Sequence, residues 1–427
     1  MVKVKKEKKK KVPLTKEQKK ARSIFGLCIF GIVVLCITLV YFVVTIINSE
    51  CAKAEINLAN KFNKVIYDDN QLVPEKDTDG YYTFVTDEEF KVLQLTDIHI
   101  GGGFLSTKKD RWSMNAVASM ITAEKPDLVV VTGDISFPVP YSAGTFNNLY
   151  GTEVFAELME SLGVYWTFTF GNHDTEVYSY FTREDLVKFY ENKNYSHCLF
   201  ERGDANISGY GNNIIKVKNT QGVVTQALVL LDSHSYTGGD ALGILWKYDN
   251  LHKDQIDWYV SEIEKINNAN KAIDVNVEKV KNSAFFHIPL REYRNAWKEY
   301  SENDYKDTEN VGFAYGNMGE PNNKNSVGEM TYGVFCGIGD DDFFEKGQQN
   351  GLQAVFCGHD HYNNFSVNYK GIRLTYGMSI DYLAYAGIWQ ETNQRGCTVI
   401  KYAPNGSFEC KAENYYQDKY VAQFEKQ

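Results

Sequence analysis

The chain has 427 residues, of which 43% are hydrophobic, and it carries a formal net charge of -10. This length suits one large domain or two of ordinary size. The charge is divided unevenly, because residues 1–22 hold ten lysines, Arg22 and only two glutamates, or about +9, which leaves about -19 for the remainder. Nucleic-acid binding needs a basic surface, so the acidic remainder argues against nucleic acid as a main partner.

Residues 24–47 contain no charged side chain. As a helix they would be about 36 Å long, enough to span a bilayer with some tilt. A cleaved signal peptide would have a shorter apolar core and a small-residue cleavage site, and residues 48–51 (Asn-Ser-Glu-Cys) make a poor one. We therefore expect residues 1–22 to form a Lys-rich cytoplasmic tail and residues 23–47 an uncleaved signal anchor. The protein would then be single-pass, with its body outside the cytoplasm.

Apolar runs alternate with helical patterns through the body of the chain. Residues 48–90 are expected to form a linker and an edge strand, and residues 91–427 the main domain. Strands are expected at 91–96, 127–132, 164–170, 213–218, 226–232, 283–286, 353–357, 364–369, 372–376 and 397–402. Helices are expected at 112–123, 152–162, 183–191, 253–266 and 343–350. Residues 299–341 are rich in Gly, Asn and Asp, and we expect a lid, a binding loop or a disordered segment there.

Five of the expected strands end in residues that are able to bind a metal ion. In α/β folds, ligands bind outside the carboxyl ends of strands. The residues at these ends are Asp97 and His99, then Asp134, Asn172 with His173, His287, and finally His359 with His361. One such histidine could be a structural histidine and one such aspartate a helix cap, but these explanations do not account for five strand ends in one chain. Carboxylate, amide and imidazole groups together suit hard to borderline metal ions, so the sequence predicts a metal site.

The same residues form a motif set that resembles the calcineurin-like metallophosphoesterase superfamily. The motifs are Asp-x-His at 97–99, Gly-Asp at 133–134, Gly-Asn-His-Asp at 171–174, the lone His287, and Gly-His-x-His at 358–361. Flanking segments, such as His-Ile-Pro-Leu at 287–290, are similar to the branch near purple acid phosphatases. The resemblance covers about residues 90–403. It implies an α/β fold with four layers, α/β/β/α, in which two mixed sheets are flanked by helices.

The resemblance also implies how a dinuclear centre would be held, with one carboxylate bridging the two ions. The first ion would be bound by Asp97, His99, Asp134 and His361, and the second by Asp134, Asn172, His287 and His359. The metals are left open between iron, manganese and zinc. Phe137 stands where purple acid phosphatases carry the tyrosine that binds ferric iron, so a coloured iron–tyrosinate centre is not expected.

Hydrolysis of phosphate esters is the activity that the resemblance implies. A metal-bridging hydroxide would attack phosphorus in line, and His173 would protonate the leaving group while Asp174 fixes its ring. Arg291 is a candidate for binding the phosphate bidentately, and the backbone of Gly101–Gly103 for approaching it. A surface charge and a flexible turn explain these last two features equally well.

Two alternatives to this activity stay open at the sequence level. One is a phosphoesterase-like binding module without catalysis, although the ligand set is complete and His173 is present. The other is a phosphodiesterase that acts on lipid or nucleotide substrates at the membrane face. The oligomeric state and the pairing of the six cysteines outside the expected membrane span are open as well.

Overall fold

The computed structural model describes residues 13–240, 243–385, 387–388 and 394–424. The chain divides into two compact units, residues 1–50 and 51–427. Helix α1 (Lys16–Ala59) begins in the first unit and is long and apolar enough to cross a membrane. Residues 48–59, which were expected to belong to a linker, are helical and continue α1.

The smaller sheet of the second unit has five strands in the order β14-β13-β3-β4-β5. Its members are β3 (Phe90–Leu95), β4 (Leu128–Thr132), β5 (Trp166–Thr169), β13 (Gly396–Tyr402) and β14 (Phe408–Asn414). Strands β3, β4 and β5 run parallel, while β13 pairs antiparallel with both β3 and β14. Strands β4 and β5 are buried along their whole length because both of their faces are covered.

The larger sheet has nine strands in the order β1-β2-β6-β7-β8-β10-β12-β11-β9. They are β1 (Glu75–Lys76), β2 (Tyr82–Val85), β6 (Asn213–Lys218), β7 (Val224–Leu230), β8 (Lys281–Phe285), β9 (Val311–Tyr315), β10 (Leu352–Cys357), β11 (Ser366–Tyr369) and β12 (Ile372–Tyr376). Its centre is parallel, from β7 through β8 and β10 to β12. Antiparallel pairs flank this centre, so the sheet is mixed, as expected.

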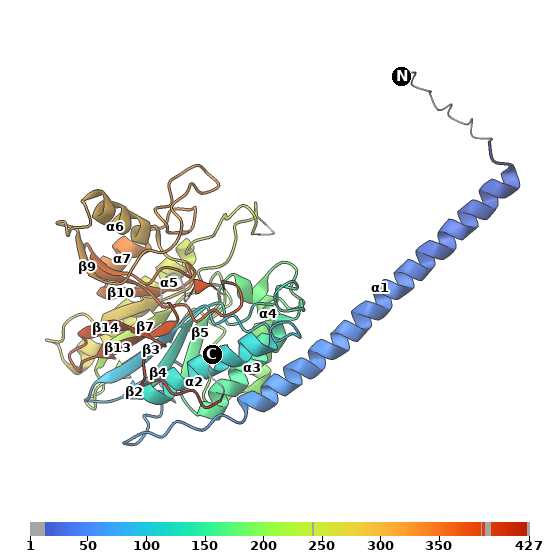
Figure 1. Ribbon diagram of the computed structural model, residues 1–427. Helices are drawn as coiled ribbons and strands as arrows, with labels where there is room; N and C mark the ends of the chain where they lie inside the picture. The colour runs from blue at the N-terminus through green and yellow to red at the C-terminus, as the bar shows by residue number, and fades with distance from the viewer. Residues whose placement is uncertain (1–12, 241–242, 386, 389–393, 425–427) are drawn as a thin grey trace. The chain divides into compact units, whose positions relative to one another are not determined.

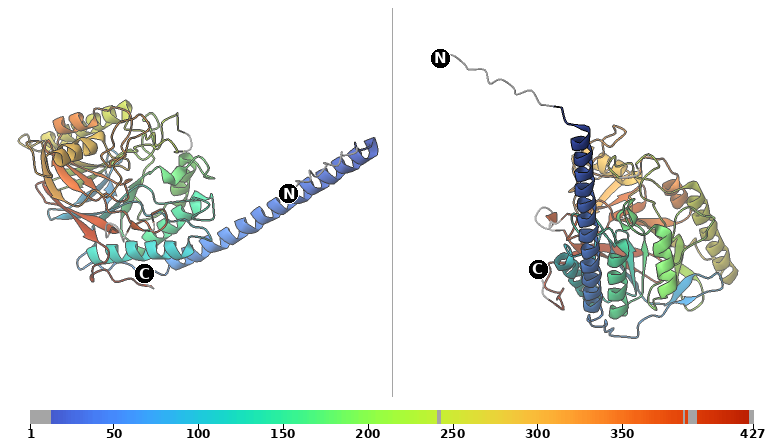
Figure 2. Two further views of the ribbon diagram at one scale, coloured as in Figure 1. Left: turned by 45° about the horizontal axis from the view of Figure 1, so that its top comes forward. Right: turned by 90° about the vertical axis from the view of Figure 1, so that its right-hand side faces the viewer.

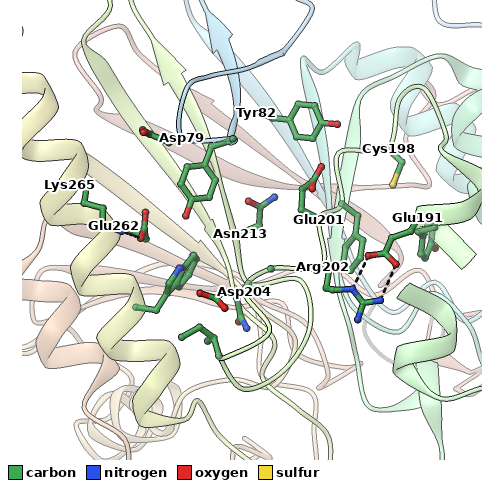
Figure 3. Close-up of a pocket in the computed structure, with 18 of the residues that line it drawn as sticks. Asp79, Tyr82, Glu191, Cys198, Glu201, Arg202, Asp204, Asn213, Glu262 and Lys265 are labelled. Atoms are coloured by element: carbon green, nitrogen blue, oxygen red, sulfur yellow. Dashed lines mark hydrogen bonds and ion pairs between the residues drawn. The ribbon is translucent and has the colours of Figure 1, made fainter. Parts of the chain in front are cut away.

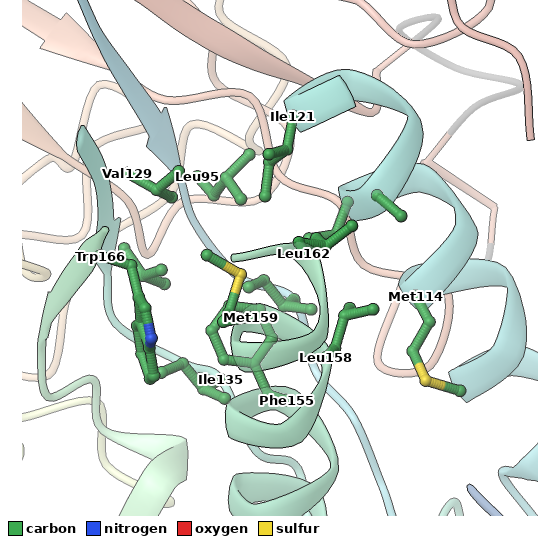
Figure 4. Close-up of a cluster of buried hydrophobic side chains, with 14 of the residues drawn as sticks. Leu95, Met114, Ile121, Val129, Ile135, Phe155, Leu158, Met159, Leu162 and Trp166 are labelled. Atoms are coloured by element: carbon green, nitrogen blue, oxygen red, sulfur yellow. The ribbon is translucent and has the colours of Figure 1, made fainter. Parts of the chain in front are cut away.

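Helices cover the outer face of each sheet (Figures 1 and 2). Helices α2 (Thr107–Glu124), α3 (Asn148–Leu162) and α4 (Arg183–Lys193) lie on the five-stranded sheet, and α5 (Lys253–Ile273), α6 (Arg291–Glu302) and α7 (Phe343–Gln349) on the nine-stranded sheet. Figure 4 shows Phe155 and Met159 of α3 beside Trp166 of β5. A third apolar cluster lies between the sheets, for example Val130 with Leu228 and Phe356. The expected α/β/β/α fold is therefore confirmed.

Several elements differ from the sequence-based expectation. Helix α3 begins at Asn148 rather than near Thr152, because the Asn147 side chain caps it by accepting the Leu149 N–H at 3.0 Å. The expected loop at 299–341 contains the end of α6 and strand β9, and β14 was not anticipated at all. All eight cysteines lie among the described residues, and none of them forms a disulfide.

Candidate metal centre

The metal-competent residues predicted from the sequence meet between the two sheets. Asp97 and His99 follow β3, Asp134 follows β4, Asn172 follows β5, His287 follows β8, and His359 and His361 follow β10. All seven side chains are buried. Each sheet therefore contributes ligands at the carboxyl ends of its parallel strands, where such folds place their ligands.

Four of these residues form a first group of converging donors. Ligand atoms of Asp97, His99, Asp134 and His361 all lie within 4.8 Å of one another. The Nε2 atom of His361 is 3.2 Å from Oδ1 of Asp97, and Nε2 of His99 is 3.4 Å from Oδ2 of Asp134. This spacing of carboxylate and imidazole donors fits a buried metal ion.

A second group of donors surrounds the Nε2 atom of His287. This atom is 3.1 Å from Oδ2 of Asp134, 3.1 Å from Oδ1 of Asn172 and 3.3 Å from Nδ1 of His359. The other ring nitrogen of His287 donates to the Thr132 carbonyl at 2.8 Å, which turns Nε2 inward. The Asp134 carboxylate thus lies beside both groups, in the position that a bridging ligand needs.

Close backbone approach is what allows so many ligands to converge. A Cβ atom on Gly171 would lie 2.1 Å from Oδ1 of Asp134, and one on Gly358 would lie 1.9 Å from Oγ1 of Thr96. Four ligand residues have left-handed backbone, with φ of 50° at Asp97, 53° at His99, 54° at Asp134 and 77° at His359. Non-glycine residues adopt this conformation at a cost, and such residues gather at functional sites.

The electrostatics of the centre suit a cation. Burial by itself would raise the pKa of Asp97 and Asp134, but facing histidines, His361 for Asp97 and His287 for Asp134, outweigh it and lower both pKa values. Burial would lower the pKa of His287, yet Asp134 raises it to about 9. The ionised carboxylates of Asp134 and Asp97 thus face two histidines of raised pKa, His287 and His361, and metal ions would replace the protons of these two rings.

Asp381 stands behind two of the histidines and was not found from the sequence. Its buried carboxylate lies 3.2 Å from Nδ1 of His99 and 3.0 Å from Nδ1 of His361. A carboxylate at this ring nitrogen fixes the orientation of a metal-binding histidine and increases its basicity. Asp381 belongs to no strand-end motif, so no local sequence pattern points to it.

His173 lies beside the centre, but Asp174 does not orient it as expected. The Asp174 carboxylate instead accepts backbone N–H groups from Asp134 at 3.0 Å, Ser136 at 2.9 Å and Gly171 at 2.8 Å. Those donors hold it against the strand ends and away from the ring. Its contribution is therefore to fix the turns that carry the ligands.

Glu176 takes the role that was expected of Asp174. Its Oε1 atom lies 2.8 Å from Nδ1 of His173 and accepts the Tyr236 hydroxyl at 3.2 Å. The Tyr236 oxygen in turn accepts the side-chain N–H of Asn172 at 3.0 Å, which directs the Asn172 carbonyl oxygen toward His287. One network thus orients both a metal-competent amide and a candidate proton donor. Glu176 lies one helical turn after His173, a spacing that would have justified considering it.

The two weaker substrate-binding expectations are not supported by the contacts. The N–H groups of Gly101 and Gly102 are bound by the Asp110 carboxylate, at 2.8 and 3.0 Å, so they are not free for a phosphate. Arg291 pairs with Asp340 and donates to the Ile338 carbonyl at 3.0 Å. It lines a small pocket that contains none of the metal-competent residues.

Two other features of the second unit have the outline of a binding site. One hollow, of about 690 Å³ and lined by residues such as Tyr82, Arg202 and Glu262, contains none of the metal-competent residues (Figure 3). His234, Asp249 and His252 form another compact group. The two imidazole rings of that group stack at 4.0 Å and 23°, so their in-plane lone pairs run side by side and do not converge on one ion.

The comparisons with known proteins agree with this geometry. The calcineurin-like phosphoesterase family matches residues 90–363. This chain belongs to that family. The matched region runs from β3 past the Gly-His-x-His motif and so includes all seven metal-competent residues.

The chain is also similar to individual curated proteins and to a solved structure. The chain is 26% identical to "Probable inactive purple acid phosphatase 28" of Arabidopsis thaliana over 82% of each chain. It is 27% identical to "Phosphatase DCR2" of Saccharomyces cerevisiae over 66% of this chain and 46% of that protein. The crystal structure of a dimetal phosphatase from Danio rerio is similar over 78% of this chain and 98% of that chain, with a TM-score of 0.44 and 10% identity. The predicted likeness to purple acid phosphatases is confirmed.

Proposed function

We propose that this protein is a membrane-anchored phosphohydrolase with a dinuclear metal centre. The observation that carries the proposal is the position of Asp134, whose Oδ2 atom lies 3.4 Å from Nε2 of His99 and 3.1 Å from Nε2 of His287. One carboxylate thus reaches both groups of donors. Residues 23–47 would be the anchor, residues 1–22 a cytoplasmic tail, and residues 91–427 the catalytic domain outside the cytoplasm.

The donor set fits two ions of iron, manganese or zinc. Asp97, His99, Asp134 and His361 would hold one ion, and Asp134, Asn172, His287 and His359 the other. When bound, the ions would polarise the phosphoryl oxygens and activate the attacking water. The residues of this chain would orient the donors, through Asp381 behind two of the histidines and the Thr132 carbonyl behind His287.

His173 is the candidate general acid. Its side chain is about a quarter exposed and lines the same pocket as His359 and His361. Because Nδ1 is held by Glu176, Nε2 is left to give its proton to the departing alcohol. Asp174 would act on the ring only indirectly, by holding the turn on which His173 lies.

The competing function is a binding module without catalysis, which the word "inactive" in a relative's name favours. The complete set of donors and the Glu176-oriented His173 favour an enzyme. A phosphodiesterase that acts on lipid or nucleotide esters remains the alternative within the enzyme class.

The test uses the full chain in detergent, loaded separately with Mn²⁺, Fe²⁺ or Zn²⁺. p-Nitrophenyl phosphate and bis-p-nitrophenyl phosphate report monoester and diester hydrolysis. We expect metal-dependent turnover of at least one ester, and a loss of roughly 100-fold or more in Asn172→Ala with the fold retained. Asn206→Ala, on an exposed loop, is the matched control. Undiminished turnover in Asn172→Ala would overturn the two-ion assignment, and no turnover by folded, metal-loaded wild type would favour the binding module.

A further inference from the structure

A pocket with aromatic walls adjoins the metal centre. It encloses about 280 Å³, and His173, His359 and His361 form part of its wall. A group attached to a phosphate at the metal centre, on the side of His173, would therefore enter it. Under the proposed function this group is the leaving alcohol of the substrate.

Five aromatic side chains make up most of the remaining wall, and they are arranged as a box. They are Trp246, Tyr248, Phe335, Tyr362 and Tyr385. The rings of Trp246 and Phe335 meet at 81°, with their centroids 5.9 Å apart, and those of Tyr362 and Tyr385 at 87° and 5.5 Å. A planar base is held best between parallel faces, whereas perpendicular walls surround a compact, rounded group.

Tyr248 and Tyr385 connect this box to the metal ligands. The Tyr248 ring stands edge-to-face on His359 at 4.3 Å and 85°, and the Tyr385 ring does the same on His361 at 4.5 Å and 83°. Trp246 and Tyr385 are nearly half exposed, at 47% and 45%, so the box opens to solvent at these two residues. Its inner end is the metal centre.

The charge of the lining favours a cation over an anion. Among the described residues that line the pocket there is no lysine or arginine, while Glu320 is present. The Glu320 carboxylate accepts the Tyr362 N–H at 3.2 Å, which fixes it in the wall. The other acid, Asp360, is turned toward the Phe335 N–H and the Tyr376 hydroxyl and is therefore structural. A second phosphate or an acidic peptide would find no positive partner here.

We propose that this box binds the cationic amino-alcohol part of a phosphate ester, with the trimethylammonium group of a phosphocholine ester as the best fit. Aromatic faces attract such cations through their quadrupoles, and one carboxylate balances the charge. The inference rests on the proposed function and names its substrate class. In the hydrolysis, water oxygen bonds to phosphorus and the bond from phosphorus to the choline oxygen breaks. His173 gives its proton to that oxygen and regains one from the attacking water by way of solvent.

The test compares phosphocholine with 3,3-dimethylbutyl phosphate, in which a neutral carbon replaces the nitrogen. The full, metal-loaded chain in a choline-free detergent is used. We expect kcat/KM to be at least about tenfold higher for phosphocholine, and this ratio to fall toward one in Trp246→Ala and in Glu320→Gln. Tyr141→Ala, an exposed aromatic position outside the pocket, should keep the wild-type ratio.

The outcomes separate the two proposals. If p-nitrophenyl phosphate is hydrolysed but kcat/KM is equal for phosphocholine and 3,3-dimethylbutyl phosphate, only the proposal of the cation box is overturned. A preference for adenosine monophosphate over phosphocholine would overturn it in the same way. No turnover of any ester would count against the proposed function itself. Phosphatidylcholine vesicles and free phosphocholine, offered side by side, would assign the group to a lipid head group or to a soluble monoester.

Discussion

At the scale of single residues, the residues that orient the histidines of the site matter as much as the candidate metal ligands themselves. The proposed general acid His173 needs a proton on Nε2, and Glu176 holds the other ring nitrogen, Nδ1. His99 and His361 present Nε2 inward because Asp381 lies at their Nδ1 atoms. Burial would lower the pKa of His99, but Asp381 and Asp134 outweigh it and raise the pKa to about 9.

A general acid should matter most for poor leaving groups. We expect His173→Asn to slow hydrolysis of an alkyl phosphate by roughly 10²–10⁴-fold, and that of p-nitrophenyl phosphate far less, because nitrophenolate departs without a proton. His197→Asn, at a histidine that pairs with Glu160 near the surface, serves as the control. Equal losses for the two esters would show that His173 acts in some other way.

Removing the charge of Asp381 should weaken metal binding without removing a ligand. We expect Asp381→Asn to lower metal affinity and turnover by roughly 10–100-fold, with activity partly restored by excess metal. Asp68→Asn, at a carboxylate that is 84% exposed, is the comparison. The metal content of both variants is measured after dialysis. Equal metal content in Asp381→Asn and Asp68→Asn would contradict the role of Asp381.

At the scale of elements, the end of α1 carries a buried carboxyl group in the second unit. Glu55 is 4% exposed and lies near Asp110, whose carboxylate holds Gly101 and Gly102. Burial first, and then the charge of Asp110, raises the pKa of Glu55 to about 10. The folded chain therefore keeps a proton here that the unfolded chain releases above its ordinary pKa of 4.5.

This retained proton makes stability fall as pH rises from about 4.5 toward 10, because the folded state binds more protons in that window. Glu55→Gln removes the dependence. We expect the variant to unfold about 2–4 °C above wild type at pH 8 and at the same temperature as wild type at pH 4. Tryptophan fluorescence of the full chain measures the unfolding temperature. Glu75→Gln, on the exposed strand β1, should change neither value. A stabilisation that is equal at both pH values would contradict the assignment.

At the scale of the whole second unit, the candidate metal centre lies between the two sheets. The ends of β3, β4 and β5 supply one part of the donors, and the ends of β8 and β10 supply the other. Each proposed ion has ligands from both sheets. Because such a site does not exist in the unfolded chain, metal binding should stabilise the fold.

We expect metal ions at 100 times their Kd to add about 2.7 kcal/mol per bound ion to the free energy of unfolding. At one fixed metal concentration the gain should be larger at pH 8 than at pH 6, since His99 and His287, each with a pKa of about 9, must lose their protons to bind metal. Asn172→Ala should show a smaller gain. Thermal unfolding with and without a chelator measures the stabilisation by metal. A stabilisation that increases as the pH is lowered would exclude His99 and His287 as ligands.

The sequence by itself determined the fold class and the metal-competent residues. Apolar strands that end in Asp, Asn or His can be recognised from the sequence, because a short apolar run followed by polar residues is enough to indicate a buried strand and its end. Asp97, Asp134 and His287 could be named for that reason. The apolar run at 24–47 could be recognised in the same way.

Only the tertiary structure decided which side chains act on one another. Asp381 and Tyr236 lie far along the chain from the residues that they orient, and no local pattern marks them. Asp174 looked like the partner of His173, but three backbone N–H groups from neighbouring strand ends bind its carboxylate instead. The aromatic box likewise draws on segments more than 100 residues apart, from Trp246 to Tyr385. Such contacts follow from the packing of whole sheets, which short sequence segments do not record.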